Sequence, residues 1–187
     1  NHKANKYGFE FKAEVDKLAD EAGIKILRNH FPQDAILTEE HGLPKESKGR
    51  LWVCDFLDGT TNFLNGSRNY SVLLAFVEND QIKNGICYLP ATDELFYAVS
   101  GEGAYCNNKR IKVSGVDELK RASIILDPGY DPEGDIKVAN LYQKLRPNVG
   151  NVGAFNANGY TLAMLAKGET AGFVHFSSKI WECSSLL

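Results

Sequence analysis

The chain is organised around one stretch of sequence, Leu51-Trp-Val-Cys-Asp-Phe-Leu-Asp-Gly-Thr-Thr-Asn-Phe63. Its apolar start, residues 51–54, predicts a short buried strand that stops at Asp55. Asp58 and Gly59 follow, and two threonines come next. Carboxylate oxygens suit hard cations such as Mg²⁺, and a glycine turn lets backbone N–H groups approach an anion. Because an Asp-Gly turn after a strand is also a common structural feature, the stretch needs partners elsewhere to form a site.

Length and charge limit the classes of protein to which this chain can belong. With 187 residues, of which 43% are hydrophobic, the chain can form one large domain or two small ones with a real core. The net charge of −3 gives no electrostatic footprint for nucleic acid. The longest apolar segments, such as residues 72–77, are far shorter than a membrane span, and no signal peptide is visible at Asn1-His-Lys. We therefore expect neither a nucleic-acid nor a membrane partner.

The four cysteines predict free thiols. Cys54, Cys87, Cys106 and Cys183 form no Cys-x-x-Cys pair, which argues against a zinc site. An even count permits disulfides, but a chain of this size with ample apolar residues does not need them. We expect reduced cysteines and a cytoplasmic protein.

Helical periodicity begins at Ala13 and ends at Pro32, which places Asp16 in the first turn of the expected helix. The preceding residues 1–12 alternate and predict a strand or an ordered arm. The elements expected after this helix are strands at 35–37, 51–54, 70–78, 81–89, 94–99, 104–106, 111–113, 121–126, 149–155 and 171–176, and helices at 136–145 and 158–166.

This order of elements predicts an α/β (α+β) fold in two parts. Residues 1–115 combine a helix with an antiparallel sheet, and residues 116–187 alternate strands and helices. Residues 127–134 are rich in turn-forming residues and read as a loop without assigned chemistry.

Several acidic residues stand where expected strands end. Glu39 follows the strand at 35–37, Asp55 and Asp58 follow the next one, and Asp16 and Glu182 flank them in the sequence. Like charges brought together repel each other unless a cation lies between them. Two or three Mg²⁺ ions would supply that cation, and they could also clamp a phosphate and activate a water.

At this point the chain resembles the inositol monophosphatase family of Mg²⁺-dependent, typically lithium-sensitive phosphatases. The central stretch resembles the family signature Asp-Pro-Leu/Ile-Asp-Gly-Thr-Thr-Asn-Phe. Four further motifs occur in the family's order: Val15-Asp-Lys17, Ile36-Leu-Thr-Glu-Glu-His-Gly42, Gly101-Glu-Gly-Ala-Tyr105 with Asn107 and Ser114, and Trp181-Glu182. The resemblance runs from about Lys6 onward. It implies a layered αβαβα sandwich, a homodimer, and a chain that continues several dozen residues beyond the Trp-Glu pair and begins with another helix.

The resemblance also implies site roles. The metal ligands would be the side chains of Glu39, Asp55, Asp58 and Glu182 and the carbonyl of Leu57. Gly59 and Thr60 would bind the phosphate through their N–H groups. Glu39, together with Thr60 held by Asp16, would orient a water for in-line attack, without a covalent phospho-enzyme.

Some positions depart from the family pattern. Phe56 replaces the usual proline, Ala13 a threonine and Glu182 an aspartate, whose longer side chain would reach about 1.5 Å further. His175 stands near the position at which inositol phosphatases have a glutamate that contacts the sugar alcohol. The resemblance implies Asn158, His175 and Glu182 as the substrate-binding residues. If His175 faces the pocket, its presence argues against inositol itself as the substrate.

The resemblance implies a phosphomonoesterase acting on a small phosphorylated polyol or sugar, similar to inositol monophosphate. Fructose 1,6-bisphosphate, histidinol phosphate and 3′-phosphoadenosine 5′-phosphate are alternative substrates. The sequence Thr61-Asn-Phe63 after the Gly-Thr pair favours the sugar-phosphate side. A further alternative is a non-catalytic regulatory homologue, because Glu182 departs from the pattern and the sequence stops at Leu187.

Overall fold

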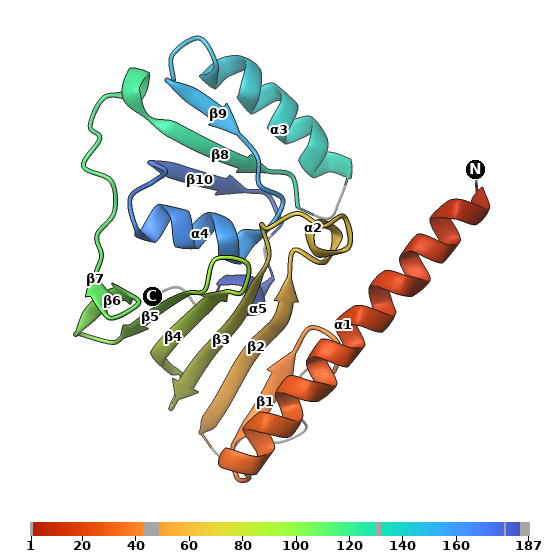
Figure 1. Cartoon of the computed structure of the whole chain (residues 1–187). Helices are drawn as coiled ribbons and strands as arrows, with labels where there is room; N and C mark the ends of the chain where they lie inside the picture. The colour runs from red at the N-terminus through yellow and green to blue at the C-terminus, as the bar shows by residue number, and fades with distance from the viewer. Residues whose placement is uncertain (1, 43–48, 130–131, 178, 184–187) are drawn as a thin grey trace.

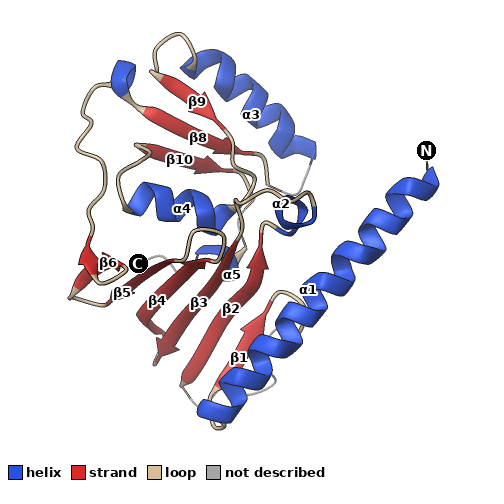
Figure 2. Cartoon of the chain, viewed as in Figure 1, coloured by secondary structure: helices blue, strands red, loops and turns tan. Residues whose placement is uncertain are grey.

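The computed structural model describes residues 2–42, 49–129, 132–177 and 179–183, of which 2–11 and 182–183 are described by their backbone. Figure 1 shows a long N-terminal helix, a large sheet and a smaller sheet, and Figure 2 shows the same view by secondary structure. Within the described parts of the chain, no helix combines the length and the apolar character needed to cross a membrane.

The helices and strands follow one another along the chain with these bounds: α1 His2–His30, β1 Ala35–Thr38, β2 Arg50–Asp58, α2 Thr60–Leu64, β3 Ser71–Glu78, β4 Gln81–Leu89, β5 Glu94–Val99, β6 Gly103–Cys106, β7 Lys109–Arg110, a 3₁₀ turn Leu119–Arg121, β8 Ser123–Asp127, α3 Pro132–Leu145, β9 Asn151–Gly153, α4 Asn158–Ala166, β10 Gly172–His175 and α5 Ile180–Cys183.

The large sheet has seven strands in sequence order, β1 to β7. β1 and β2 are parallel, whereas every later pair is antiparallel. Asn79 and Asp80 join β3 to β4 with φ values of 51° and 61°, the left-handed turn that a two-residue hairpin requires. The small sheet has the order β10-β8-β9 and is parallel throughout.

The elements stack in five layers. α1 packs on β2, while α4 and α5 contact the strands of the same sheet from its other face. α4 also contacts β10 of the small sheet, and α3 contacts β8. Figure 1 shows this succession from α1 to α3, which confirms the expected αβαβα sandwich.

Adjacent residues of β3 show why both faces of the large sheet are covered. Leu74 packs against the hydrophobic cluster that contains Leu27 of α1, and Leu73 belongs to the cluster that contains Ala163 and Met164 of α4. Successive side chains of a strand point to opposite faces. An unbroken apolar run such as that of β3 is therefore typical of a strand buried on both sides.

Four local predictions were wrong. Residues 2–12 continue α1 instead of forming a strand or arm, because extending an existing helix needs no new nucleus. Asp16 therefore lies well inside the helix, away from its first turn. β2 does not stop at Asp55 but runs on to Asp58, paired with β3 through a register shift. Residues 111–113 form no strand, and the edge of the sheet is the short β7.

Candidate active site

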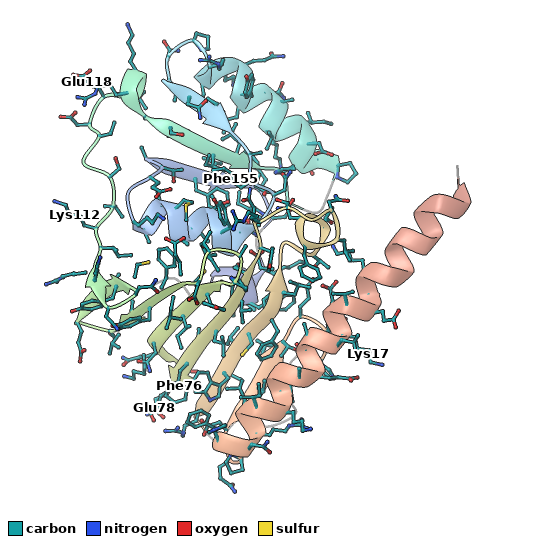
Figure 3. All side chains as sticks on the ribbon, in the orientation of Figure 1. Lys17, Phe76, Glu78, Lys112, Glu118 and Phe155 are labelled. Atoms are coloured by element: carbon teal, nitrogen blue, oxygen red, sulfur yellow. The ribbon has the colours of Figure 1, made fainter. Side chains whose placement is uncertain are left out.

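A cavity of about 340 Å³ lies where the two sheets meet. From the side of the large sheet it is lined by α1, the turn after β1, the end of β2 and the start of α2. From the side of the small sheet it is lined by the ends of β8 and β10 and by the residues that lead into α4. In Figure 3 the labelled Phe155, just before these residues, lies between the sheets. Segments that are far apart in the sequence thus line one cavity.

The end of β2 brings Asp55 and Asp58 to this cavity. The register against β3 shifts between the two residues, which is typical of a bulge that re-aims side chains. Asp55 is buried, and its Oδ1 accepts the Leu57 N–H at 3.0 Å. The same short segment therefore presents two carboxylates and Leu57 to one space.

Asp58 joins the large sheet to α4. Its Oδ2 accepts the Ser71 hydroxyl at 2.8 Å and the Gly159 N–H at 2.9 Å, and its Oδ1 accepts the Asn158 N–H at 3.1 Å. The residue is 5% exposed. These hydrogen bonds fix the Asp58 side chain between β3 and α4.

Gly59 and Thr60 form the turn from β2 into α2. Gly59 has φ 80°, and a Cβ at this position would lie 2.8 Å from the Ala157 Cβ and 2.9 Å from the Asn69 carbonyl oxygen. Only glycine accepts this backbone and this close approach. Gly59, Thr60 and Thr61 all line the cavity, so this turn lies at its wall.

Asp16 of α1 holds the Thr60 side chain. The Thr60 hydroxyl donates to Asp16 Oδ1 at 2.5 Å, and the Leu57 carbonyl lies 3.1 Å from the same hydroxyl. One proton cannot serve both acceptors, and the charged one makes the stronger bond. Burial raises the pKa of Asp16, while the Thr60 hydrogen bond and the nearby Lys12 ammonium partly offset the rise.

Glu39 lines the cavity from the turn after β1. A buried network holds this turn: Asp20 of α1 accepts the Thr38 hydroxyl at 2.8 Å and also contacts the His41 imidazole. The backbone N–H of His41 donates a hydrogen bond to the Thr38 hydroxyl at 3.1 Å. Glu40 lines a smaller neighbouring pocket, where burial, followed by the charges of Asp16 and Asp20, raises its pKa.

His175 and Asn158 lie on the opposite wall of the cavity. His175 ends β10, and its Nε2 lies 3.2 Å from the Asn158 amide and 3.6 Å from Asp127 Oδ1. Its Nδ1 accepts the Ser177 N–H at 3.3 Å. The structure therefore places both predicted substrate-binding residues at the cavity. Glu182 lies in α5 by its backbone, and its side chain is outside the described residues.

The donors on the cavity wall are oxygen atoms of the kind that Mg²⁺ prefers. Among the described residues, no three carboxylate, imidazole or thiolate groups are gathered closely enough to hold a metal ion by themselves. Mg²⁺ does not need such a group, since it usually binds through one or two carboxylates and keeps several waters. Glu39, Asp55, Leu57 and Asp58 thus fit a hard divalent cation by the chemistry of their donors.

Two charged residues of the cavity lining were not predicted from the sequence. Asp127 lies at the end of β8 in a stretch that had been assigned no chemistry, and Lys12 lies one helical turn before Asp16. Asp127 follows an apolar run, as Asp55 does, and that shared pattern could have identified it. Nothing in the sequence around Lys12 separates it from the other lysines of α1.

Known proteins are similar to this chain in sequence and in fold. A profile of the inositol monophosphatase family matches residues 2–185. The fructose-1,6-bisphosphatase/inositol-1-monophosphatase of Aquifex aeolicus is 30% identical over 177 residues, covering 94% of this chain and 67% of the relative. The Nus factor SuhB of Pasteurella multocida is 30% identical over 180 residues, with the same two coverages.

A solved structure of the inositol monophosphatase from Anabaena is 30% identical and has a TM-score of 0.84, covering 92% of this chain and 69% of that one. The chain thus spans about two thirds of the length of these relatives. Because the family profile covers nearly the whole sequence, the chain belongs to the inositol monophosphatase family.

Proposed function

We propose that this protein is a metal-dependent phosphomonoesterase that hydrolyses a small phosphorylated polyol or sugar. The observation that carries the proposal is the shared cavity: Glu39, Asp55 and Asp58 line it together with the Gly59 turn and the Thr60 hydroxyl. Oxygen donors for a hard cation lie there beside N–H groups for an anion. A phosphate ester needs both, because negative charge spreads over its oxygens during transfer.

Each side chain has a proposed task. The N–H groups of Gly59 and Thr60 bind the phosphate. Glu39 and the Thr60 hydroxyl orient the attacking water, and Asp16 accepts a hydrogen bond from that hydroxyl and fixes its direction. The water gives up a proton through the Thr60 hydroxyl to Asp16, and its oxygen forms a bond to phosphorus. The bond from phosphorus to the substrate oxygen breaks in line, and the leaving alkoxide takes a proton from solvent to become the alcohol product.

Glu39, Asp55, Asp58, the Leu57 carbonyl and Glu182 are the proposed ligands of two or three Mg²⁺ ions. When bound, the cations supply Lewis acidity toward the phosphate and lower the pKa of a water. Lithium sensitivity is proposed on the family resemblance.

Phosphate release in the presence of Mg²⁺ tests the proposal. Inositol 1-phosphate, fructose 1,6-bisphosphate, histidinol phosphate and 3′-phosphoadenosine 5′-phosphate form the substrate panel. We expect turnover that EDTA abolishes, that returns with Mg²⁺, and that Asp55→Asn removes. Lack of turnover on any phosphomonoester by a folded, Mg²⁺-supplemented protein would overturn it.

A regulatory role without catalysis is the second candidate. The similarity to proteins named Nus factor SuhB supports it. The Asp55→Asn variant separates the two, because a purely regulatory function does not need the proposed metal ligand and persists without it.

Organisation and location are proposed on less direct grounds. The division into residues 1–115 and 116–187 is supported by the two separate sheets. A cytoplasmic location is supported by the free thiols of Cys54, Cys87 and Cys106. The homodimer is proposed on the family resemblance, and size-exclusion chromatography with light scattering tests it.

A further inference from the structure

One buried carboxylate on the cavity wall has no task in the proposed reaction. Asp127 ends β8 of the small sheet, whereas the Gly59 turn ends β2 of the large one, and the cavity separates them. The Asp127 side chain is 11% exposed. It therefore faces the part of the cavity that holds the rest of the substrate when phosphate occupies the Gly59 turn.

The structure gives Asp127 few partners. Its Oδ1 accepts the Gly129 N–H at 3.0 Å, which closes the turn after β8. Within the described ranges, no lysine or arginine lies within ion-pair distance of it, and His175 Nε2 at 3.6 Å is the one basic nitrogen nearby. At 3.6 Å this separation is longer than a hydrogen bond.

His175 makes its closer contacts with other residues. Its Nδ1 accepts the Ser177 N–H at 3.3 Å, and its Nε2 lies 3.2 Å from the Asn158 amide nitrogen, nearer than Asp127 Oδ1. Among the described residues, the Asp127 carboxylate therefore lies on the cavity wall with no basic side chain within hydrogen-bond distance.

We propose that Asp127 determines substrate specificity by excluding a second phosphate from this part of the cavity. A buried carboxylate repels another anion, and such repulsion is a common source of selectivity between related ligands. The same carboxylate accepts a hydrogen bond from a hydroxyl or amino group. The inference rests on the proposed function and restricts it to monophosphates whose distal end donates hydrogen bonds.

The Asp127→Asn variant isolates the charge. Its amide oxygen can still accept the Gly129 N–H, so the turn keeps its hydrogen bond, while the negative charge is lost. Asp135→Asn is the matched control, because Asp135 lies exposed in the first turn of α3, outside the cavity lining. Both changes remove one charge from the chain.

The measurement compares two ligands that differ by one phosphate, fructose 6-phosphate and fructose 1,6-bisphosphate, by calorimetric titration with Mg²⁺ in an Asp16→Asn background that slows turnover. We expect Asp127→Asn to shift the ratio of the two dissociation constants toward the bisphosphate by about 10- to 100-fold. Added salt should reduce the preference for fructose 6-phosphate over fructose 1,6-bisphosphate in the protein that retains Asp127. The same preference in the Asp127→Asn variant should not change with salt.

An unchanged ratio, an equal loss of affinity for both ligands, the same shift in Asp135→Asn, or no binding of either ligand overturns the inference. Because the readout is binding, it is independent of hydrolysis by the unmodified protein. If the expected shift is observed but the unmodified protein hydrolyses no phosphomonoester, the inference about Asp127 holds and the proposed catalytic function is wrong.

Discussion

The hydroxyl of Thr60 lies 2.5 Å from Asp16 Oδ1, a contact that joins α2 to the middle of α1 across 44 positions of sequence. The two residues lie on different helices, and both line the cavity between the sheets. Asp16 thus holds the side chain of Thr60, one of the two proposed phosphate-binding residues.

Removing the hydroxyl in Thr60→Val should lower kcat by about 10²-fold or more, with a smaller change in KM. The attacking water would lose a positioned group, and such groups contribute about 10²- to 10⁴-fold. Steady-state kinetics on the best substrate of the panel measures it. Glu14→Gln, an exposed change on the same helix, is the control and should leave kcat unchanged. A Thr60→Val enzyme with full kcat contradicts the assigned role.

Asp16→Asn should raise the melting temperature slightly, on the order of 1–2 °C, while lowering activity. Burial raises the pKa of Asp16, so the ionised carboxylate destabilises the folded state at neutral pH. The unfolded chain ionises at the ordinary aspartate pKa. The unmodified protein therefore recovers this stability as pH falls through the raised pKa, and its difference from the variant should shrink there. Thermal unfolding from pH 7 to pH 4 measures it, and a difference that widens on acidification contradicts the prediction.

Gly59→Ala should destabilise the fold by about 2–4 kcal/mol and abolish phosphate binding. The new Cβ would meet the Ala157 Cβ at 2.8 Å and the Asn69 carbonyl oxygen at 2.9 Å, in a left-handed backbone. Gly66→Ala is a matched control, because Gly66 has φ 72° but nothing within 4 Å of the added Cβ. It should cost only about 1–2 kcal/mol of backbone strain. Urea unfolding compares the two, and equal losses would show that the crowding has no effect.

Asp58→Asn should lose stability as well as activity, by about 2–4 kcal/mol. The amide nitrogen that replaces one oxygen would face N–H or O–H groups among Ser71, Asn158 and Gly159, which the carboxylate now accepts. In Asp55→Asn the Leu57 N–H can still be accepted by the amide oxygen, so activity should fall with a smaller loss of stability. Urea unfolding and phosphate release on both variants measure this split. If both variants unfold at the same urea concentration, Asp58 does not bridge the sheet and α4 as described.

Much of the fold could be predicted from local pattern. The hairpin around Asn79 and Asp80 and the bounds of α4 are as expected, because turn chemistry and apolar periodicity act over a few residues. The two-sided burial of β3 follows the same logic. For residues 2–12 the local pattern gave the wrong prediction. Their alternation extends over only a few residues, and these residues instead continue α1.

By itself the sequence determined which oxygen-bearing side chains end the strands, and the motif order that marks the family. The tertiary structure decided which of them meet: Asp58 contacts the N–H groups of Asn158 and Gly159, 100 and 101 positions away, and Asp127 comes to face the same cavity from a second sheet. The reason is physical. Hydrophobic periodicity and turn residues specify local backbone, whereas convergence depends on how two separately formed sheets pack around α4 and α5.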